Sequence, residues 1–256
     1  MDRRTFLKTV PAVTVLAGTA AGLANSLQSL AAANPKPEDS NDSAENQTPV
    51  DLEPIKLPEP EKDGGKSVLA SIQLRQTTRN IKPDKLPLQM LSNLLWAAFG
   101  INRPQASFGK SGRTAASASN SQEIDLYVAL EEGVYIYDAA SHTLKPVVKG
   151  DFRARAGRRG RGGGGGMAPV RIFYVVDLEK YDTSDRQPDR SIGDPEVQKS
   201  YYYTDTGLIA QNVYLFAASQ GLAAWFHNCD KENTPGEFKL RSRQRVLFAQ
   251  SVGYPA

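Results

Sequence analysis

The run Val-Arg-Ile-Phe-Tyr-Val-Val at residues 170–176 is the feature that most restricts the fold of this chain. Its β-branched and aromatic side chains predict a strand, and its nearly continuous apolar character predicts an interior strand of a sheet. Residues 123–130 and 134–137 predict two more strands, joined as a hairpin by Glu-Glu-Gly at 131–133, and residues 246–252 predict a last one. The domain is therefore expected to form around a β-sheet.

Helical patterns lie between these strands. Residues 88–99 carry an apolar stripe at helical spacing, and Gly100 follows as a stop signal. Residues 204–220 carry a second stripe with Gly221 placed to cap it, and residues 67–74 predict a short helix. Helices interleaved with strands, with at least one hairpin, predict an α+β domain around a mixed sheet.

The charge and cysteine content exclude several classes of protein. With 31 Lys and Arg against 28 Asp and Glu, the formal charge of +3 gives no broad electrostatic argument for nucleic acid or a membrane surface. Cys229 is the single cysteine, so an intrachain disulfide is impossible. The trio His227, Cys229 and Asp230 lacks a second pair of ligands, and we therefore expect no metal site.

The N-terminus has the features of an export signal. Asp-Arg-Arg-Thr-Phe-Leu-Lys at 2–8 resembles a twin-arginine motif, and a weakly apolar stretch follows at 10–23. Three alanines at 31–33 supply the small residues of a cleavage site. Residues 1–33 are therefore expected to be a signal segment that sends the protein to the periplasm or cell envelope. A retained membrane anchor and a cytosolic chain with a basic N-terminus are the alternatives.

The amino-acid composition distinguishes a linker from a folded domain in the rest of the chain. Residues 34–66 are rich in Pro, acidic residues, Asn and Ser, which predicts a disordered or extended linker. The domain is expected over 67–256. Within it, residues 150–168 hold five arginines and a run of five glycines, which predicts a flexible loop. Arg-Gly tracts can bind nucleic acid, but this one has no interleaved aromatic residues, and we expect no nucleic-acid partner.

Three ordered segments of the domain resemble the nitroreductase family, especially its branch related to azoline-forming dehydrogenases. The first runs from Arg-Gln-Thr-Thr-Arg at 75–79 to the helix that ends in Leu-Leu-Trp-Ala-Ala-Phe-Gly at 94–100. The second is Ala-Ser-Ala-Ser-Asn-Ser-Gln-Glu at 116–123 with the hairpin after it, and the third runs from Asp205 to Gly-Tyr-Pro at 253–255. The resemblance implies a nitroreductase-like fold with a mainly antiparallel sheet flanked by helices.

The resemblance also implies a cofactor, FMN, bound at a homodimer interface. In the first segment Arg75 and Thr77 would meet the FMN phosphate and ribityl chain, with Gln76 between them, and Arg79 would approach the pyrimidine edge of the flavin. Arginine suits a phosphate because its guanidinium group offers several donors in a fork. A cation at the pyrimidine edge favours the negative charge of a reduced flavin.

The other two segments complete the implied cofactor site. Asn120 and Gln122 would hydrogen-bond the ribityl chain or the polar atoms of the ring, because an amide side chain both donates and accepts. Phe226, His227 and Asn228 fall where the family lays backbone beside the isoalloxazine. The cofactor performs the hydride chemistry in such enzymes, so no catalytic acid or base is assigned to the protein.

The expected function is that of an FMN-dependent oxidoreductase that acts on a small organic substrate. One departure from the family pattern motivates an alternative: this sequence stops at Ala256, whereas the family continues with a basic segment that contacts the phosphate. A second departure is Ala116-Ser117, which stands where the family has Pro-Ser. The alternative is a degenerate nitroreductase fold that serves as a binding or interaction module without flavin.

Overall fold

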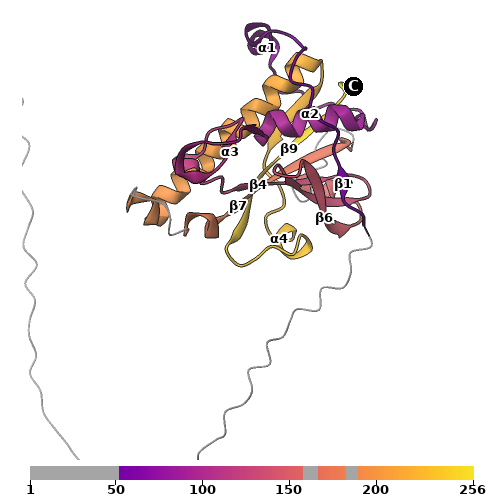
Figure 1. The fold of residues 1–256 in the computed structure, drawn as a ribbon. Coiled ribbons are helices and arrows are strands. Elements are labelled where there is room, and N and C mark those ends of the chain that lie inside the picture. Colours follow the sequence, from indigo (N-terminus) through magenta and orange to yellow (C-terminus); the bar gives the residue numbers. More distant parts are fainter. Residues whose placement is uncertain (1–51, 158–166, 183–189) are drawn as a thin grey trace, which may run out of the picture. The chain divides into compact units, whose positions relative to one another are not determined.

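The computed structural model describes residues 52–157, 167–182 and 190–256, and the statements below concern these residues. Seven strands form one sheet in the order β1-β6-β5-β4-β7-β9-β8, and every neighbouring pair runs antiparallel (Figure 1). The strands of this sheet are β1 (Ile55–Lys56), β4 (Ile124–Ala129), β5 (Gly133–Asp138), β6 (Thr143–Lys149), β7 (Val170–Asp177), β8 (Ala223–His227) and β9 (Gln244–Gly253). The predicted α+β class with a mainly antiparallel sheet is confirmed.

Four α-helices accompany the sheet, together with short helical turns. The α-helices are α1 (Val68–Leu74), α2 (Leu88–Phe99), α3 (Pro195–Gln220) and α4 (Thr234–Glu237). The 3-10 turns are η1 (Ser107–Gly109), η2 (Ala118–Asn120), η3 (Arg153–Ala156), η4 (Leu178–Tyr181) and η5 (Arg190–Gly193). A separate two-stranded ribbon joins β2 (Ile101–Arg103) to β3 (Gly112–Arg113).

Strand β7 has the interior position that its sequence predicts. It pairs with β4 on one side and β9 on the other, and all eight of its residues are buried. Because side chains alternate along a strand, Ile172 and Tyr174 point into one core and Phe173 and Val175 into another. The sheet is therefore covered on both faces in its middle.

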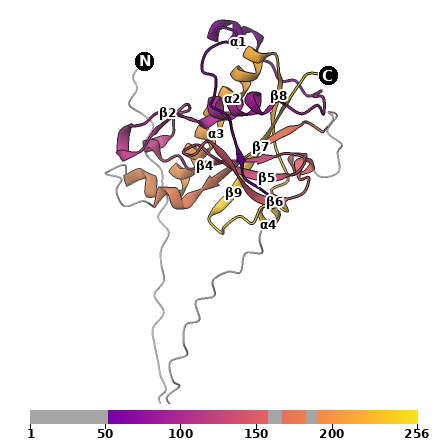
Figure 2. The same ribbon diagram turned by 45° about the vertical axis from the view of Figure 1, so that its right-hand side comes forward.

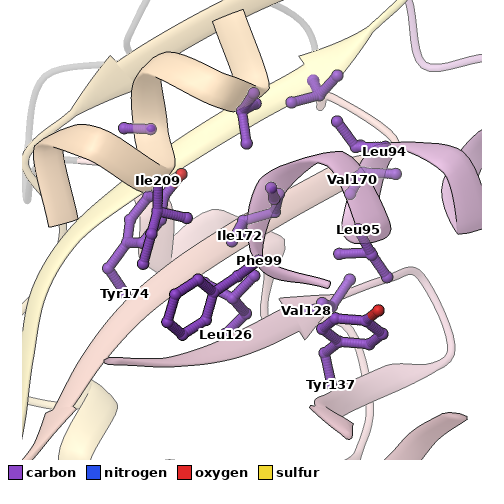
Figure 3. Close-up of a cluster of buried hydrophobic side chains, with 14 of the residues drawn as sticks. Leu94, Leu95, Phe99, Leu126, Val128, Tyr137, Val170, Ile172, Tyr174 and Ile209 are labelled. Carbon is purple, nitrogen blue, oxygen red and sulfur yellow. The ribbon is translucent and has the colours of Figure 1, made fainter. Parts of the chain in front are cut away.

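Helices α2 and α3 lie across one face of the sheet, and α4 lies on the opposite side (Figures 1 and 2). Leu94 and Leu95 of α2 and Ile209 of α3 pack against β4 and β7 in the larger core, shown in Figure 3. In the other core the buried ring of Phe238 lies edge-on to Phe173, with 5.0 Å between the ring centroids. The α2–α3 layer carries the candidate functional site.

Helix α3 begins nine residues before the predicted start at Thr204. Asp194 caps it by accepting a hydrogen bond from the backbone N–H of Glu196, and Pro195 occupies the first turn, where a missing N–H costs nothing. The helix ends as predicted at Gly221, which adopts a left-handed conformation with φ of 70°.

Two strands of the sheet carry weak sequence signals. Strand β6 contains Pro146 and two lysines, and a register shift in its pairing with β5 accommodates the irregularity. Strand β8 is a short edge strand that begins with two alanines, which are poor strand formers. The amino-acid propensities of neither segment predict a strand. Each is a strand because of its pairing, β6 with β5 and β8 with β9.

The domain begins earlier than the predicted boundary at residue 67. Strand β1 pairs with β6, Leu57 is 4% exposed within the main core, and the backbone N–H of Glu61 donates to Asn93 Oδ1 at 2.8 Å. The end of the expected linker 34–66 is thus part of the fold. Three apolar residues spaced among prolines were too few to reveal it in the sequence; they are Leu52, Ile55 and Leu57.

The ends of the expected flexible loop 150–168 are also anchored. Arg153 is buried and donates two hydrogen bonds to Asp151, at 2.9 and 2.7 Å. Arg155 donates two to Glu237 at 2.7 and 2.5 Å, and Ala156 lies in the second core. Two of the arginines that suggested mobility are therefore fixed by carboxylates, while residues 158–166 lie outside the described residues.

Candidate functional site

The segment 75–79 leaves α1 and runs beside strand β8. Arg75 ends the helix with an extended ψ of 119°, which turns the chain toward the sheet. The backbone N–H of Thr78 donates to the carbonyl of Ala224 at 3.0 Å, and Ile81 pairs with Pro255. These backbone contacts bring the first predicted site segment next to the last one.

Tyr214 of α3 joins the two segments. Its hydroxyl lies 3.0 Å from Thr77 Oγ1 and accepts a hydrogen bond from the backbone N–H of Phe226 at 2.8 Å. The guanidinium carbon of Arg75 lies 5.4 Å from the centre of the same ring, a distance at which cation–π attraction operates. Three of the predicted cofactor residues therefore meet at one tyrosine.

Arg79 continues this arrangement along β8. Its guanidinium carbon lies 5.6 Å from the centre of the Trp225 ring, and that ring contacts the His227 ring at a tilt of 44° with 4.3 Å between centroids. Within the part of the chain that the structure describes, neither Arg75 nor Arg79 pairs with an acidic side chain. Both therefore keep donors that a ligand could use.

A hollow of about 320 Å³ lies beside this segment. Gln76, Thr78 and Tyr214 line it together with Lys66 and with residues at the end of α3 and the start of β8. The described lining contains one cation and no acidic side chain. An anionic ligand would meet no repulsion from the hollow itself.

His227 and Asn228 have different surroundings. Both ring nitrogens of His227 have partners: Nε2 lies 2.9 Å from Ser251 Oγ and Nδ1 lies 2.8 Å from the carbonyl of Asn228. Burial lowers the pKa of His227 below its usual range, so the ring is neutral at pH 7. The Asn228 side chain is exposed. His227 therefore helps to fix the end of β8.

Asn120 and Gln122 are turned into their own loop. Asn120 Nδ2 donates to the carbonyls of Ser107 and Ser111 at 3.0 and 3.2 Å, and its Oδ1 accepts from Gln122 Nε2 at 2.9 Å. Gln122 Oε1 accepts from Arg113 Nε at 2.8 Å. Positive φ angles of 50° and 55° at Asn120 and Gln122 belong to the same tight turn.

This loop meets α3 at a different place from Arg75. The backbone N–H of Ala118 donates to Asp205 Oδ2 at 2.9 Å, whereas Arg75 and Thr77 contact Tyr214. Nine residues of α-helix separate Asp205 from Tyr214, a rise of about 13.5 Å. The fold of the chain therefore brings together the predicted residues of segments 75–79 and 225–228, and holds Asn120 and Gln122 at a different part of α3.

A buried acidic cluster lies under the 117–122 loop. Glu123 and Asp205 are 0% and 4% exposed, and the Ser121 hydroxyl donates to Glu123 Oε2. Burial, together with the charge of Glu123, raises the pKa of Asp205 to about 7. Glu123 Oε1 and the Tyr181 hydroxyl are buried, and neither has a hydrogen-bond partner among the residues that the structure describes. This cluster ties the loop to the middle of α3.

The trio at 227–230 has no ligand geometry for a metal. Burial raises the pKa of the Cys229 thiol to about 12, so no thiolate is available at pH 7. Asp230 accepts hydrogen bonds from Asn233 and from the backbone N–H of Glu232. Among the described residues, no group of three or more His, Cys, Asp or Glu side chains could hold a metal ion.

The sequence and the fold together identify the family. The family model described as "Nitroreductase family" matches residues 72–254, which is most of the chain. The chain belongs to the nitroreductase family. A curated relative, MJ1384 of Methanocaldococcus jannaschii, carries a nitroreductase name and is 28% identical over 221 residues, which cover 83% of this chain and 97% of MJ1384.

Solved structures agree with membership of the nitroreductase family. A crystal structure from Ralstonia eutropha JMP134, titled as a nitroreductase, is 30% identical with a TM-score of 0.69, and the match covers 79% of this chain and 90% of that one. The Escherichia coli microcin synthetase McbBCD complex, solved with truncated pro-MccB17, matches at 19% identity and a TM-score of 0.56, over 83% and 79% of the two chains. The latter likeness shows the fold alone.

Two residues of this nitroreductase-family site were missed in the sequence. Tyr214 and Asp205 lie on the long helix, where an apolar stripe was read as core. Asp205 lies four residues before Ile209 and so shares the buried face of the helix, which is an unusual location for a carboxylate and the one signal that could have marked it. No helix among the described residues is long and apolar enough to cross a membrane.

Proposed function

We propose that this protein is an FMN-dependent oxidoreductase that acts on a small organic substrate. The observation that carries the proposal is the pair Arg75 and Arg79, whose guanidinium groups lie over the rings of Tyr214 and Trp225 without an acidic partner among the described residues. Membership of a family of oxidoreductases supports the general activity. The flavin is our inference from this donor set.

The residues present fit FMN by their chemistry. Arg75 and the Thr77 hydroxyl offer donors for a phosphate and a ribityl chain, and Arg79 offers a second cation four residues further along the chain. The hollow lined by Gln76 and Thr78 of the same segment has no acidic side chain in its described lining, so it adds no repulsion for a phosphate held nearby. Bound FMN would supply hydride transfer, while these side chains hold and orient it.

Asn120 and Gln122 have a different role in this proposal. Their amide groups are already paired with Ser107, Ser111 and Arg113. We infer that they shape the loop, and that any contact with a flavin would use the backbone of that loop. This assignment separates residues that bind the cofactor from residues that position the site.

The proposed assembly is a homodimer. Helix α1 leaves four large apolar side chains in solvent: Val68, Leu69, Ile72 and Leu74 are 69%, 79%, 54% and 49% exposed. Such a patch directly before Arg75 is typical of a surface that another protein covers. A second copy of the chain would bury these side chains and shield the flavin site from water.

The proposed location is the periplasm or cell envelope. The support is the Arg3-Arg4 motif and the apolar stretch after it. Replacing both arginines by lysine should keep the full-length protein in the cytoplasm of a host with a twin-arginine route. Export at the wild-type rate would contradict this part of the proposal. Retention of exported protein in the membrane fraction would identify an uncleaved signal.

An FMN titration of the purified protein tests the cofactor assignment. Arg75→Gln and Arg79→Gln should each weaken FMN binding by about 10- to 100-fold, because a hydrogen bond to a charged group contributes about 1.5–3 kcal/mol. Lys239→Gln is the control, since it removes one positive charge from an exposed position after α4. Equal affinity in all variants would contradict the site. A folded wild-type protein that takes up no FMN would favour the binding-module alternative.

A further inference from the structure

A second hollow lies at the start of α3, away from Tyr214. It measures about 350 Å³ and shares no lining residue with the hollow beside Gln76. Its walls come from the first turns of α3, the residue after β7, the first part of β9 and Lys231 in the loop after β8. Figure 1 shows the start of α3 near the end of β7.

The described lining of this hollow is positively charged. Three cations, Lys199, Lys231 and Arg245, face one acid, Glu196, which leaves a net charge of +2 (3 − 1). Lys199 pairs with Glu196 at 3.6 Å, and both side chains are exposed. Among the described residues, Lys231 and Arg245 have no ion pair. These two cations are therefore available to an anion.

An aromatic wall connects this hollow to β8. Tyr203, which lines the hollow, lies 5.9 Å from Phe248, and Phe248 lies 4.9 Å from Phe226, measured between ring centroids. Lys231 Nζ lies 4.9 Å from the centre of the Phe248 ring. These three rings thus connect Tyr203 and Lys231 in the hollow to Phe226, a residue of the segment proposed to lie beside the flavin.

We propose that this hollow binds a planar aromatic anion, with Lys231 and Arg245 on its carboxylate and the Tyr203 ring against its aromatic face. The guanidinium fork of Arg245 suits a carboxylate, and an aromatic ring packs on tyrosine by stacking. This inference rests on the proposed function, because it makes the bound anion the substrate. It names the substrate class as aromatic carboxylates rather than neutral aromatics.

The test compares two probes of similar size and different charge. Binding of 4-nitrobenzoate and of neutral 4-nitrobenzyl alcohol is measured by calorimetry on the full chain, without an electron donor. Wild-type protein should bind the carboxylate about 10-fold or more tightly than the alcohol, because charge-assisted hydrogen bonds are the strong ones. The double variant Lys231→Gln/Arg245→Gln should lose this preference and keep its affinity for the alcohol.

Two controls separate loss of anion recognition from a general loss of charge or of folding. Lys239→Gln should bind both probes as the wild type does, and a thermal melt checks that the double variant is folded. Equal affinity of the wild type for the two probes, no binding of 4-nitrobenzoate, or an unchanged preference in the double variant would overturn the inference. Flavin content is read separately from visible absorbance. A colourless protein that prefers the anion would contradict the proposed function and the substrate role of the anion, while the anion site itself would stand. A flavoprotein without the preference would contradict only this inference.

Discussion

The hydroxyl of Tyr214 accepts a hydrogen bond from the backbone N–H of Phe226 at 2.8 Å, and so links the long helix to the edge strand of the sheet. The same hydroxyl lies 3.0 Å from Thr77 Oγ1, and Arg75 lies over the ring. One side chain on α3 therefore sets the relative position of the segments at 75–79 and 225–228. Loss of that hydroxyl should loosen both segments at once.

Tyr214→Phe tests this linkage. The variant keeps the ring under Arg75 but leaves the N–H of Phe226 without its acceptor, so the free energy of unfolding should fall by about 1–3 kcal/mol in a urea titration. FMN binding should weaken as well. Tyr201→Phe on the same helix is the control, and it should have little effect on either quantity. If the two variants behave alike, Tyr214 does not organise the site.

The buried pair Glu123 and Asp205 predicts a pH dependence of stability. Since the pKa of Asp205 rises from 3.8 to about 7 on folding, the folded state binds more protons than the unfolded state between these values. The free energy of unfolding should therefore fall as the pH rises from about 4 to 7. Asp205→Asn should flatten this fall while its side-chain oxygen still accepts from Ala118. Parallel curves for the two proteins, from urea titrations at pH 5 to 8, would refute the assignment.

Gln122 should act on stability and not through a flavin contact. Gln122→Leu removes the acceptor of Arg113 Nε, which leaves a half-buried guanidinium with one bond fewer. The expected loss is about 1–3 kcal/mol in the free energy of unfolding. Addition of FMN in excess should stabilise the variant and the wild type by the same amount. A smaller gain for the variant would instead place Gln122 in contact with the cofactor.

The apolar surface of α1 predicts a protein–protein contact. Leu69→Lys places a charge at the most exposed of its apolar residues, and should shift the purified protein from dimer to monomer in sedimentation experiments. The monomer should also hold FMN less tightly, because its site is open to water. Lys239→Gln, an exposed position after α4 and outside the candidate site, is the control. A wild-type protein that sediments as a monomer would contradict the proposed assembly.

Much of the fold could be predicted from periodicity. The 170–176 strand, the 88–99 helix and the hairpin after Glu123 have strong local signals, and all three were confirmed. Strands β1, β6 and β8 could not be predicted from local sequence. Strand β1 has only two residues, β6 contains Pro146 and β8 begins with two alanines, so each is defined by its pairing with a neighbouring strand. The early start of α3 was missed because its first residues are polar and exposed.

The candidate site was predictable in part. Arg75, Thr77 and Phe226 were identified from the resemblance, and the structure places them around Tyr214. Asn120 carried the same kind of signal, yet its amide groups serve its own loop. A sequence pattern shows which side chain can donate or accept, but the backbone turn decides which partner is nearer.

The visible absorption spectrum of the purified, folded protein tests the central claim most directly. The account predicts a flavin spectrum, with FMN as the molecule released on denaturation, and recovery of that spectrum when FMN is added back. A colourless protein that stays colourless after incubation with excess FMN, while its circular dichroism shows the α+β fold intact, would contradict the account.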